Sequence, residues 1–384
     1  MKILLVGSGG REHALGVGLQ ADPACTQLHV APGNPGIAQF AQCHPLVITD
    51  NQAILELAQH LDIDLVVVGP EVPLVNGVAD ILRAAGIAVF GPSKAAAQLE
   101  GSKNFAKEVM RDAGVPTAHS FTCTTLEEIE IALDAFDAPF VVKDDGLAAG
   151  KGVVVTNDRQ AALEHALACK RVVIEEYLNG PEVSLFGISD GKTIVPMQPA
   201  QDFKRAFDGD EGPNTGGMGA YSPLPWAPSD IIEDTYKQVL APMIAEMAAR
   251  GTPFVGLLYA GLALTDHGTR VIEFNARFGD PETQVLIPLL KTPLATLLYK
   301  AATGDLAGTT LDWKDDSAVT VVLAAEGYPT APKSGGVVTG FSAIDDVQIY
   351  HAGTSATEQG VVASGGRVLT VTGIGEDLTE ARNR

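Results

Sequence analysis

Residues 140–156, FVVKDDGLAAGKGVVVT, decide how the rest of the chain is interpreted. Two short β-branched runs, 140–142 and 153–156, flank a glycine-rich loop that carries Lys151, and Lys143 follows the first run. Glycines leave backbone N–H groups open to an oxyanion, because no Cβ blocks positive φ or close contact. The pattern predicts a phosphate-binding β-hairpin, although a plain flexible hairpin explains the glycines equally well when they are considered alone.

The loop does not have the spacing of a P-loop. Only three residues separate Gly146 from Gly150, and Gly152 stands where that motif needs a hydroxyl group for Mg²⁺. A P-loop is therefore excluded. The glycine-rich loop would then bind phosphate without the P-loop motif, and Lys143 would supply a point charge beneath it.

The composition indicates a soluble globular protein with several domains. The chain has 384 residues, of which 46% are hydrophobic and 19% charged, and its formal net charge is -21. That length predicts two to four domains, and the negative charge opposes binding to nucleic acid or anionic membranes. The four cysteines are scattered and are expected to be reduced thiols. With no signal peptide and no apolar run of about 20 residues, we expect a cytoplasmic protein. We also expect a monomer or weak homodimer.

The first 30 residues form a strand, a glycine turn and a helix. Residues 2–6 are a buried-type strand that leads into GSGGREHAL, residues 7–15. Glu12 occupies the place of the third glycine of a dinucleotide fingerprint, and the strand at 27–30 lacks the acidic residue that would bind an adenosine ribose. NAD is therefore not expected, but the helix N-terminus, with Arg11 in its first turn, suits a phosphate.

Further strands at 65–68 and 88–90 complete an open parallel sheet. Ligands of such sheets lie beyond the carboxyl ends of the strands, so the turns that follow the strands should converge on one crevice. Each turn considered alone could also be an ordinary βα connection. The converging residues are Gly9, Gly10, Arg11, Asn34, Gly36, Gly69, Pro70 and Glu71.

The central region is expected to contain a small lobe built around the glycine-rich hairpin. A helical pattern over 94–113 carries Lys103, and further helices are predicted over 127–136 and 161–169. A strand at 171–177 follows. The acidic residues at its end and just after it could accept hydrogen bonds from an adenine amino group or a ribose hydroxyl, or could form a solvated edge. These residues are Glu175, Glu176 and Glu182.

The larger part of the central region carries two segments of interest. Residues 202–226, DFKRAFDGDEGPNTGGMGAYSPLPW, are too polar and glycine-rich for a core, and we expect a long functional loop. The strand VIEFN, 271–275, places Glu273 and Asn275 on one face, and their oxygens suit a hard cation such as Mg²⁺. The alternative, a salt bridge from Glu273 to Arg277, leaves Asn275 unexplained.

The other elements follow from periodicity and turn residues. The remaining predicted helices are 231–250, 294–304 and a short one from 377, and the remaining strands are 183–189, 192–201, 256–265, 318–325, 336–341, 347–351, 360–363 and 368–373. The last five strands indicate that a β-rich module ends the chain.

With these residues in place, the chain resembles the phosphoribosylamine-glycine ligase (glycinamide ribonucleotide synthetase) family of the ATP-grasp superfamily. The resemblance covers nearly the whole chain. The glycine-rich loop alone is generic, whereas NTGGMGAYSP together with EFNARFGDPETQ is specific. The segments that carry it, in order, are GSGGREHAL, GPEVPLVNG, VVKDDGLAAGKGV, VIEEYLNGPEVSL, DFKRAFDGDEGPNTGGMGAYSP and EFNARFGDPETQ.

The resemblance implies a multidomain fold of the α/β and α+β classes, with an N-terminal open parallel sheet, an ATP-grasp lid and body, and a C-terminal β-rich domain. The implied ranges are 1–102 for the N-terminal substrate-binding domain and 103–325 for the ATP-grasp domain, with a lid at about 116–190. The C-terminal domain, 326–384, is expected to be incomplete, because the family continues beyond the helix that begins near Asp377.

The resemblance also implies a reaction in which ATP, glycine and 5-phosphoribosylamine give ADP, phosphate and glycinamide ribonucleotide. By similarity, ATP would be bound by Lys103, Lys143, Gly150, Lys151, Gly152, Glu175, Glu176, Tyr177, Leu178 and Glu182. Mg²⁺ or Mn²⁺ would be held by Glu273 and Asn275. Glycine and the amine would be placed by Asp202, Lys204, Arg277 and Asp280 with Asn214, Thr215, Gly216, Gly217, Met218, Gly219 and Ala220, and the ribose phosphate would lie at the N-terminal turns.

Two rival functions remain at this point. Another ATP-grasp ligase or carboxylase would share the lid and the metal-binding strand, but not the NTGGMGAYSP segment or the N-terminal phosphate turns. A regulatory protein that binds ATP without turnover would share the nucleotide site alone. Phosphate release that requires both glycine and phosphoribosylamine would distinguish the implied ligase from both rivals.

Overall fold

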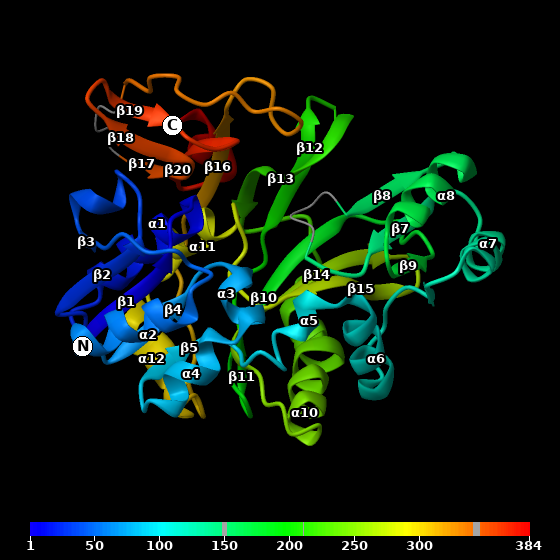
Figure 1. Cartoon of the computed structure of the whole chain (residues 1–384), viewed down its shortest axis with the longest axis horizontal. Helices are drawn as coiled ribbons and strands as arrows, with labels where there is room; N and C mark the ends of the chain where they lie inside the picture. Colours follow the sequence, from blue (N-terminus) through cyan, green and yellow to red (C-terminus); the bar gives the residue numbers. More distant parts are fainter. Residues whose placement is uncertain (148–151, 210, 341–345) are drawn as a thin grey trace.

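The computed structural model describes residues 1–147, 152–209, 211–340 and 346–384. Its N-terminal part, at the left of Figure 1, is a sheet of five parallel strands in the order β3-β2-β1-β4-β5 with helices on its faces. Across these ranges, no helix is long and apolar enough to cross a membrane. The elements are β1 (Lys2–Gly7), α1 (Gly10–Ala21), β2 (Gln27–Pro32), η1 (Ile37–Gln39), β3 (Gln42–Cys43), α2 (Asn51–His60), β4 (Leu65–Val68), α3 (Glu71–Asn76), α4 (Val78–Ala84) and β5 (Ala88–Phe90).

The central strands of this sheet are apolar because both of their faces are covered. All four residues of β4 are buried, as are Ile3 to Val6 of β1. Such continuous apolar runs are typical of parallel strands between two helical layers. The carboxyl ends of β1, β2 and β4 therefore meet at one edge, as the sequence predicts.

A small lobe at the right of Figure 1 contains an antiparallel sheet in the order β6-β9-β7-β8 and its own hydrophobic cluster. The glycine-rich hairpin forms β7 and β8, as predicted. Thr125 and Glu128 form a capping box at the start of α7. The elements are β6 (Ser120–Cys123), α7 (Leu126–Asp134), β7 (Phe140–Asp144), β8 (Val153–Thr156), α8 (Arg159–Ala168) and β9 (Val172–Glu175).

The helix predicted over 94–113 is interrupted in the structure. It forms α5 (Gln98–Gly101) and α6 (Lys103–Ala113), and Ser102 separates them in an extended conformation. The Ser102 hydroxyl accepts a hydrogen bond from the Phe105 amide, so this residue caps a new helix. Lys103 therefore occupies the first helical position of α6.

A second antiparallel sheet, in the order β11-β10-β14-β15, forms the body between the N-terminal part and the small lobe. One hydrophobic cluster joins β1, β10 and α11, and Phe90 packs against Phe278 with ring centroids 6.0 Å apart. The predicted helix at 231–250 is continuous but contains a π-helical turn. The elements are β10 (Glu182–Asp190), β11 (Ile194–Pro196), α9 (Ile231–Thr235), η2 (Tyr236–Leu240), α10 (Ala241–Ala249), β14 (Val255–Thr265), β15 (Gly268–Asn275), α11 (Thr283–Leu289) and α12 (Leu294–Thr303).

The expectation of a loop over 202–226 is wrong. Most of this segment forms a hairpin of β12 (Gln201–Phe207) and β13 (Glu211–Ser222), with register shifts between the strands. β13 also pairs with a C-terminal strand, so its polar, glycine-rich backbone is hydrogen-bonded on both sides at Gly219 and Ala220. Backbone pairing does not require apolar side chains, and composition therefore misled the prediction.

The C-terminal strands continue that hairpin into a sheet of order β12-β13-β16-β20-β17, which lies above the parallel sheet in Figure 1. The strand expected at 336–341 is absent over 336–340, where Val337 makes only an isolated bridge to Val362, and residue 341 lies outside the described ranges. The elements are β16 (Ser317–Ala324), β17 (Val347–His351), β18 (Thr354–Thr357), β19 (Gly360–Ala363), β20 (Arg367–Gly375) and α13 (Leu378–Asn383). The predicted fold class is confirmed.

Candidate active site

Lys143 lies at the end of β7 and is buried between the small lobe and the body. Its ammonium group forms an ion pair with Glu175 of β9 and donates a hydrogen bond to the Ile272 carbonyl oxygen at 3.1 Å. Lys107 of α6 reaches the other carboxylate oxygen of Glu175 at 2.7 Å. Burial raises the pKa of the Glu175 carboxyl, but the two ammonium groups outweigh burial and hold that pKa below its usual range. Glu175 is therefore a buried counter-charge, and the alternative of a solvated edge is wrong for this residue.

Lys103 extends from the first turn of α6 toward the glycine-rich hairpin. Its ammonium group donates to the carbonyl oxygen of Gly146 at 3.0 Å, and burial lowers its pKa while the nearby Glu273 carboxylate acts in the opposite direction. Gly152 is buried, and its carbonyl oxygen accepts a hydrogen bond from the Asp144 amide at 2.7 Å. Gly150 and Lys151 lie outside the described residues.

The predicted adenine edge follows β9. Glu176 accepts hydrogen bonds from the His119 amide at 3.0 Å and from the Arg270 guanidinium at 2.9 Å, while the Tyr177 side chain is exposed. Leu178 is half-buried, and the exposed Glu182 carboxylate lies 3.1 Å from the Lys204 ammonium group. Glu176 is therefore paired within the protein, and Glu182 is an exposed carboxylate next to Lys204.

Glu273 and Asn275 lie on β15, on the face opposite the buried Phe274. Within the described ranges, the Glu273 carboxylate has no ion pair, and the Asn275 amide nitrogen donates to the Phe274 carbonyl oxygen at 3.1 Å, which leaves its side-chain oxygen available. No cluster of three or more His, Cys, Asp or Glu suited to a metal occurs in the described residues. Two oxygen donors fit Mg²⁺, which takes few protein ligands and completes its shell with phosphate and water.

The alternative ion pair from Glu273 to Arg277 is wrong. Arg277 lies 3.1 Å from a carboxylate oxygen of Glu100 and 3.4 Å from one of Glu71. Burial raises the pKa of Glu100 despite this pairing, whereas Arg277 and Arg11 outweigh burial at Glu71 and hold its pKa below the usual range. Arg277 therefore joins the turn after β4 to the turn after β15.

Asp202 and Lys204 face the same region from β12. The Asp202 carboxyl is 8% exposed, and burial raises its pKa to about 7 although the Lys204 ammonium group, 4.0 Å away, opposes the shift. Burial also disfavours the charged form of Lys204, but Asp202, Glu182 and Glu273 together hold its pKa well above the ordinary value. The Glu273 carboxylate of β15 favours the charged form of both Lys103 and Lys204.

The N-terminal turns converge as predicted, but Glu12 occupies their centre. Its carboxylate accepts a hydrogen bond from the Gly9 amide at 2.6 Å and pairs with Arg11 at the same distance. A Cβ atom at Gly69 would lie 2.2 Å from the Glu12 carboxylate, which shows how closely the turns after β1 and β4 approach it. The Gly9 amide, predicted to bind phosphate, is therefore bonded to Glu12 in this structure, and Gly10 faces Gln284 of α11.

Asn34 connects the turn after β2 to two other segments. Its amide nitrogen donates to the carbonyl oxygens of Ser8 and His351, each at 2.9 Å, and its oxygen accepts from the amides of Gly36 and Ile37 at 3.0 Å. All of its polar capacity is used within the protein. Asn34 thus fixes the turn to the C-terminal strands, and its predicted contact with a ribose phosphate remains a prediction.

Arg367, the first residue of β20, was missed by the sequence reasoning. Its guanidinium donates to the carbonyl oxygens of Gly216 and Asp280, each at 2.7 Å, and pairs with the Asp280 carboxylate at 3.1 Å. The Tyr328 hydroxyl accepts from the Gly216 amide at 3.0 Å. The C-terminal module thereby holds two predicted substrate segments together. Arg367 lies 151 positions from Gly216 and 87 from Asp280, so local patterns gave no signal for this link.

Gly217 explains why β13 can approach the turn at Asp280. Its φ is +110°, a conformation that L side chains rarely adopt, and a Cβ atom there would lie 2.5 Å from the Pro281 ring. The rest of the predicted segment is well ordered by hydrogen bonds, because the Thr215 hydroxyl donates to the Lys204 carbonyl oxygen at 2.8 Å and accepts from the Gly217 amide at 3.0 Å. Asn214 pairs with Arg205 across the hairpin, Met218 is half-buried, and Gly219 and Ala220 pair with β16.

Three sequence models of one family match the chain in order. The N domain of phosphoribosylglycinamide synthetase matches residues 1–100, its ATP-grasp (A) domain residues 101–283, and its C domain residues 318–384. The matched regions correspond to the parallel sheet, to the small lobe with the body, and to the C-terminal strands.

Curated relatives match over the full chain. A phosphoribosylamine-glycine ligase of Streptomyces coelicolor is 60% identical and is covered to 94% of its length, and one of Corynebacterium ammoniagenes is 56% identical and is covered to 92%; both alignments span 100% of this chain.

The chain is also similar to solved structures. The crystal structure of phosphoribosylamine-glycine ligase from Thermotoga maritima matches with a TM-score of 0.85 and 33% identity, over 100% of this chain and 95% of that one. A biotin carboxylase domain from Hydrogenobacter thermophilus matches with a TM-score of 0.75 over 97% of this chain and 85% of that one, but its identity of 16% shows a shared fold alone. By its three matching domain models and its relatives, the chain belongs to the phosphoribosylglycinamide synthetase family.

Proposed function

We propose that this chain joins glycine to 5-phosphoribosylamine with ATP and forms glycinamide ribonucleotide, ADP and phosphate, a step of purine biosynthesis. The observation that carries the proposal is the 60% identity, across the whole chain, to a relative named for this reaction. The charged and polar residues support it. Lys143 and Lys103 lie beside the glycine-rich hairpin, β15 offers oxygen atoms of Glu273 and Asn275, and Arg277 pairs with Glu71 after β4. A domain division at 1–102, 103–325 and 326–384 remains part of the proposal.

Each group of residues has one task in this scheme. Lys103, Lys143 and Gly152, with Gly150 and Lys151, would bind the phosphates of ATP, and Glu176 to Leu178 with Glu182 would bind its adenosine. Glu175 would act through Lys143 and Lys107, because its carboxylate is already paired with them. The turns around Gly9, Gly36 and Glu71 would take the ribose phosphate.

Glu273 and Asn275 would hold Mg²⁺ or Mn²⁺, which when bound offsets negative charge on the phosphates of ATP. Lys103 and Lys143 would hold the transferred phosphoryl group, with charge already fixed before the reaction. Asp202, Lys204, Arg277 and Asp280 would orient glycine and the amine at the edge between β12 and the body. Fixed positions matter because correct alignment of two reactants removes much of the entropic barrier.

The proposed order is phosphorylation of glycine followed by attack of the amine. A free carboxylate is a poor electrophile because an attacking amine would have to expel an oxide. In the first step a glycine oxygen attacks the γ-phosphorus and ADP leaves. In the second, the neutral amine attacks the acyl carbon, and phosphate leaves with that oxygen. The nitrogen loses one proton, which the released phosphate takes up, so atoms and charge balance.

Glycine labelled with ¹⁸O in both carboxylate oxygens tests this order. One labelled oxygen should appear in the released phosphate and the other in the amide product, as measured by mass spectrometry. A reaction without phosphoribosylamine is the control and should release little phosphate. Retention of both labels in the organic products would contradict a glycyl phosphate, whereas phosphate release that depends on bicarbonate instead of glycine would indicate a carboxylase.

Arg367 provides a second test, because it holds Gly216 and Asp280 in place from another domain. We expect Arg367→Met to lower kcat/KM for glycine by about 10- to 100-fold, since a small displacement of aligned groups has effects of this size. Arg367→Lys should restore little, because lysine cannot form the same forked contacts. Steady-state kinetics measure the effect.

Arg384→Met is the matched control: it breaks ion pairs to Asp346 and Glu380 in the same module, away from the site. Equal kinetics of the Arg367 and Arg384 variants would contradict the positioning role.

A further inference from the structure

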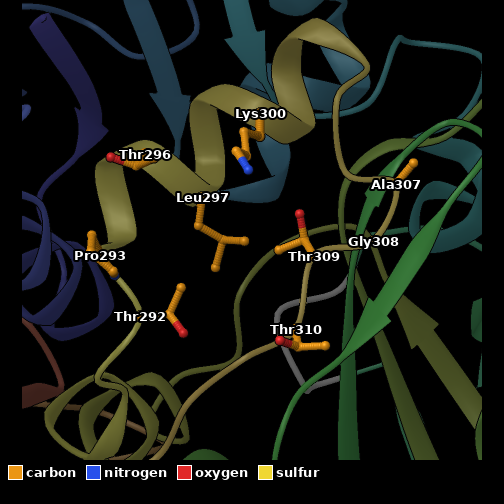
Figure 2. A pocket seen from close by; sticks show the side chains of 9 residues that line it. All are labelled: Thr292, Pro293, Thr296, Leu297, Lys300, Ala307, Gly308, Thr309 and Thr310. Carbon is orange, nitrogen blue, oxygen red and sulfur yellow. The ribbon is translucent and has the colours of Figure 1, made fainter.

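Gln284 lies in the first turn of α11, next to the candidate active site, and no step of the proposed reaction uses it. α11 lies beside α1 and below the C-terminal strands in Figure 1. It is separate from the pocket of about 350 Å³ beside α12, whose lining residues include no group assigned to the reaction (Figure 2). Gln284 is 0% exposed. It cannot contact a substrate from this position, so any effect on the reaction must pass through a neighbouring residue.

The amide group of Gln284 holds one of the two carboxylate oxygens of Asp280. Its Nε2 atom donates a hydrogen bond to Asp280 Oδ1 at 2.8 Å, while the Arg367 guanidinium lies 3.1 Å from Oδ2. A carboxylate only accepts hydrogen bonds, so the amide must face it with its NH₂ group. The Asp280 side chain remains 16% exposed. Gln284 therefore orients a carboxylate that a substrate can reach.

The oxygen of the Gln284 amide gives a second, independent observation. This Oε1 atom is buried and, among the described residues, accepts no hydrogen bond. A buried acceptor without a partner lowers stability, and a methionine side chain would fill a similar space without that cost. Packing alone therefore does not explain a glutamine here. The NH₂ group that faces Asp280 is the part that a hydrocarbon side chain could not replace.

The Gln284 amide also lies against the first turn of α1. A Cβ atom at Gly10 would lie only 2.7 Å from Gln284 Nε2, and one at Gly9 would lie 3.7 Å from Asp280 Oδ2. The amide and the carboxylate are thus directly beside the turn proposed to take the ribose phosphate. Asp280 therefore lies on the side of the site proposed for phosphoribosylamine.

We propose that Gln284 is a positioning residue for the amine substrate of the proposed reaction, on which this inference rests. It acts through Asp280, whose carboxylate it orients to accept an N–H of phosphoribosylamine. A carboxylate that accepts this N–H leaves the lone pair of the nitrogen free to attack the acyl carbon. A protonated carboxyl group would instead donate to that lone pair and block the attack.

The charges around Asp280 favour the ionised form that this role needs. Burial raises the pKa of the Asp280 carboxyl, but the Arg367 and Arg11 guanidinium groups, the hydrogen bond from Gln284 and the Arg277 guanidinium outweigh burial. Together they hold the pKa of Asp280 below its usual range. Asp280 is therefore a carboxylate at neutral pH, and Gln284 contributes to both its charge and its orientation.

Steady-state kinetics of Gln284→Met test the positioning role. We expect kcat/KM for phosphoribosylamine to fall by about 10- to 100-fold, because the carboxylate loses its fixed orientation, while the KM values for ATP and glycine change by less than about twofold. Gln238→Met is the matched control and should behave as the wild type does. Gln238 also donates to an aspartate four positions earlier, Asp234, but at an exposed position outside the candidate site.

Gln284→Glu adds a measurement that a purely structural role would not change. The introduced carboxyl group can donate to Asp280 while it is protonated, but it repels Asp280 once it is ionised. Burial beside another carboxylate raises the pKa of such a group. The ratio of kcat/KM for this variant to that of the wild type should therefore fall as the pH rises from about 6 to about 9.

A double-mutant cycle with Asp280→Asn tests whether Gln284 acts through Asp280. Gln284→Met should cause little further loss in the Asp280→Asn background, because the carboxylate is already absent. The unfolding temperature of Gln284→Met should stay within a few degrees of the wild type, since the change also removes the unpaired oxygen.

Four results would overturn the inference. They are an equal further loss in the Asp280→Asn background, a ratio for Gln284→Glu that does not change with pH, an equal rise of all three KM values in Gln284→Met, and a large fall in its unfolding temperature. The last two would assign Gln284 to the stability of the fold. A wild-type enzyme that releases no phosphate with ATP, glycine and phosphoribosylamine would instead overturn the proposed function, and this inference with it.

Discussion

Replacing Glu273 with glutamine should reduce turnover by about 10²- to 10³-fold and leave the fold intact. Glutamine has nearly the same shape but lacks the negative charge proposed to hold the metal opposite the triphosphate, and loss of one preorganised charge contact has effects of this order. The fold should be unaffected because, among the described residues, no ion pair involves Glu273, and its strand neighbour Phe274 remains buried.

Initial rates at saturating substrates and across a range of Mg²⁺ concentrations measure this effect. Glu358→Gln, at an exposed position in the turn between β18 and β19, is the matched control for the loss of one negative charge. Unchanged turnover of Glu273→Gln at saturating Mg²⁺ would remove Glu273 from the metal site. The unfolding temperature of both variants should stay within a few degrees of the wild type, because neither change disturbs the core.

Replacing Lys143 with methionine should weaken both nucleotide use and the fold. The change removes a buried positive charge proposed to contact the phosphates, so we expect kcat/KM for ATP to fall by about 100-fold or more. It also removes one of the two partners of Glu175. Breaking a buried ion pair costs about 3–5 kcal/mol, and we expect the lower end of that range because Lys107 remains 2.7 Å from the same carboxylate.

Lys107→Met separates these two effects. It leaves Glu175 with Lys143 alone and should lower the free energy of unfolding by a similar amount, since Lys107 also donates to Thr117 and Ala118. Its effect on ATP use should be much smaller. Adding Glu175→Gln to Lys143→Met should restore part of the lost stability without restoring nucleotide binding. If Lys143→Met and Lys107→Met reduced ATP binding equally in calorimetric titrations, Lys143 would have only a structural role.

Local sequence patterns were sufficient where a short segment determines its own structure. The apolar run that becomes β1 and the glycine-rich hairpin of β7 and β8 both formed as predicted. Each depends on side-chain periodicity or turn chemistry within about ten residues. The i, i+2 pairing of Glu273 and Asn275 on one strand face is likewise a consequence of strand geometry.

Segments whose structure depends on distant partners were predicted less well. Residues 202–226 form a hairpin because β13 is paired on both sides, by β12 and by β16, which begins at Ser317. The strand expected at 336–341 reduces to a single bridge at Val337 over its described part. In both segments the hydrogen-bond partners, rather than the composition, decide whether a strand forms.

The order of elements, the fold class, the polar residues available to the site and the family resemblance all follow from the amino-acid sequence. How those polar residues are paired follows only from the folded chain. Glu175 lies beneath two lysines, Arg277 joins Glu100 to Glu71, and Arg367 reaches Gly216 from 151 positions away. Ion pairs and hydrogen bonds act over a few ångströms in space, and sequence periodicity reports only on neighbours along the chain, so these partners become known only when the chain is folded.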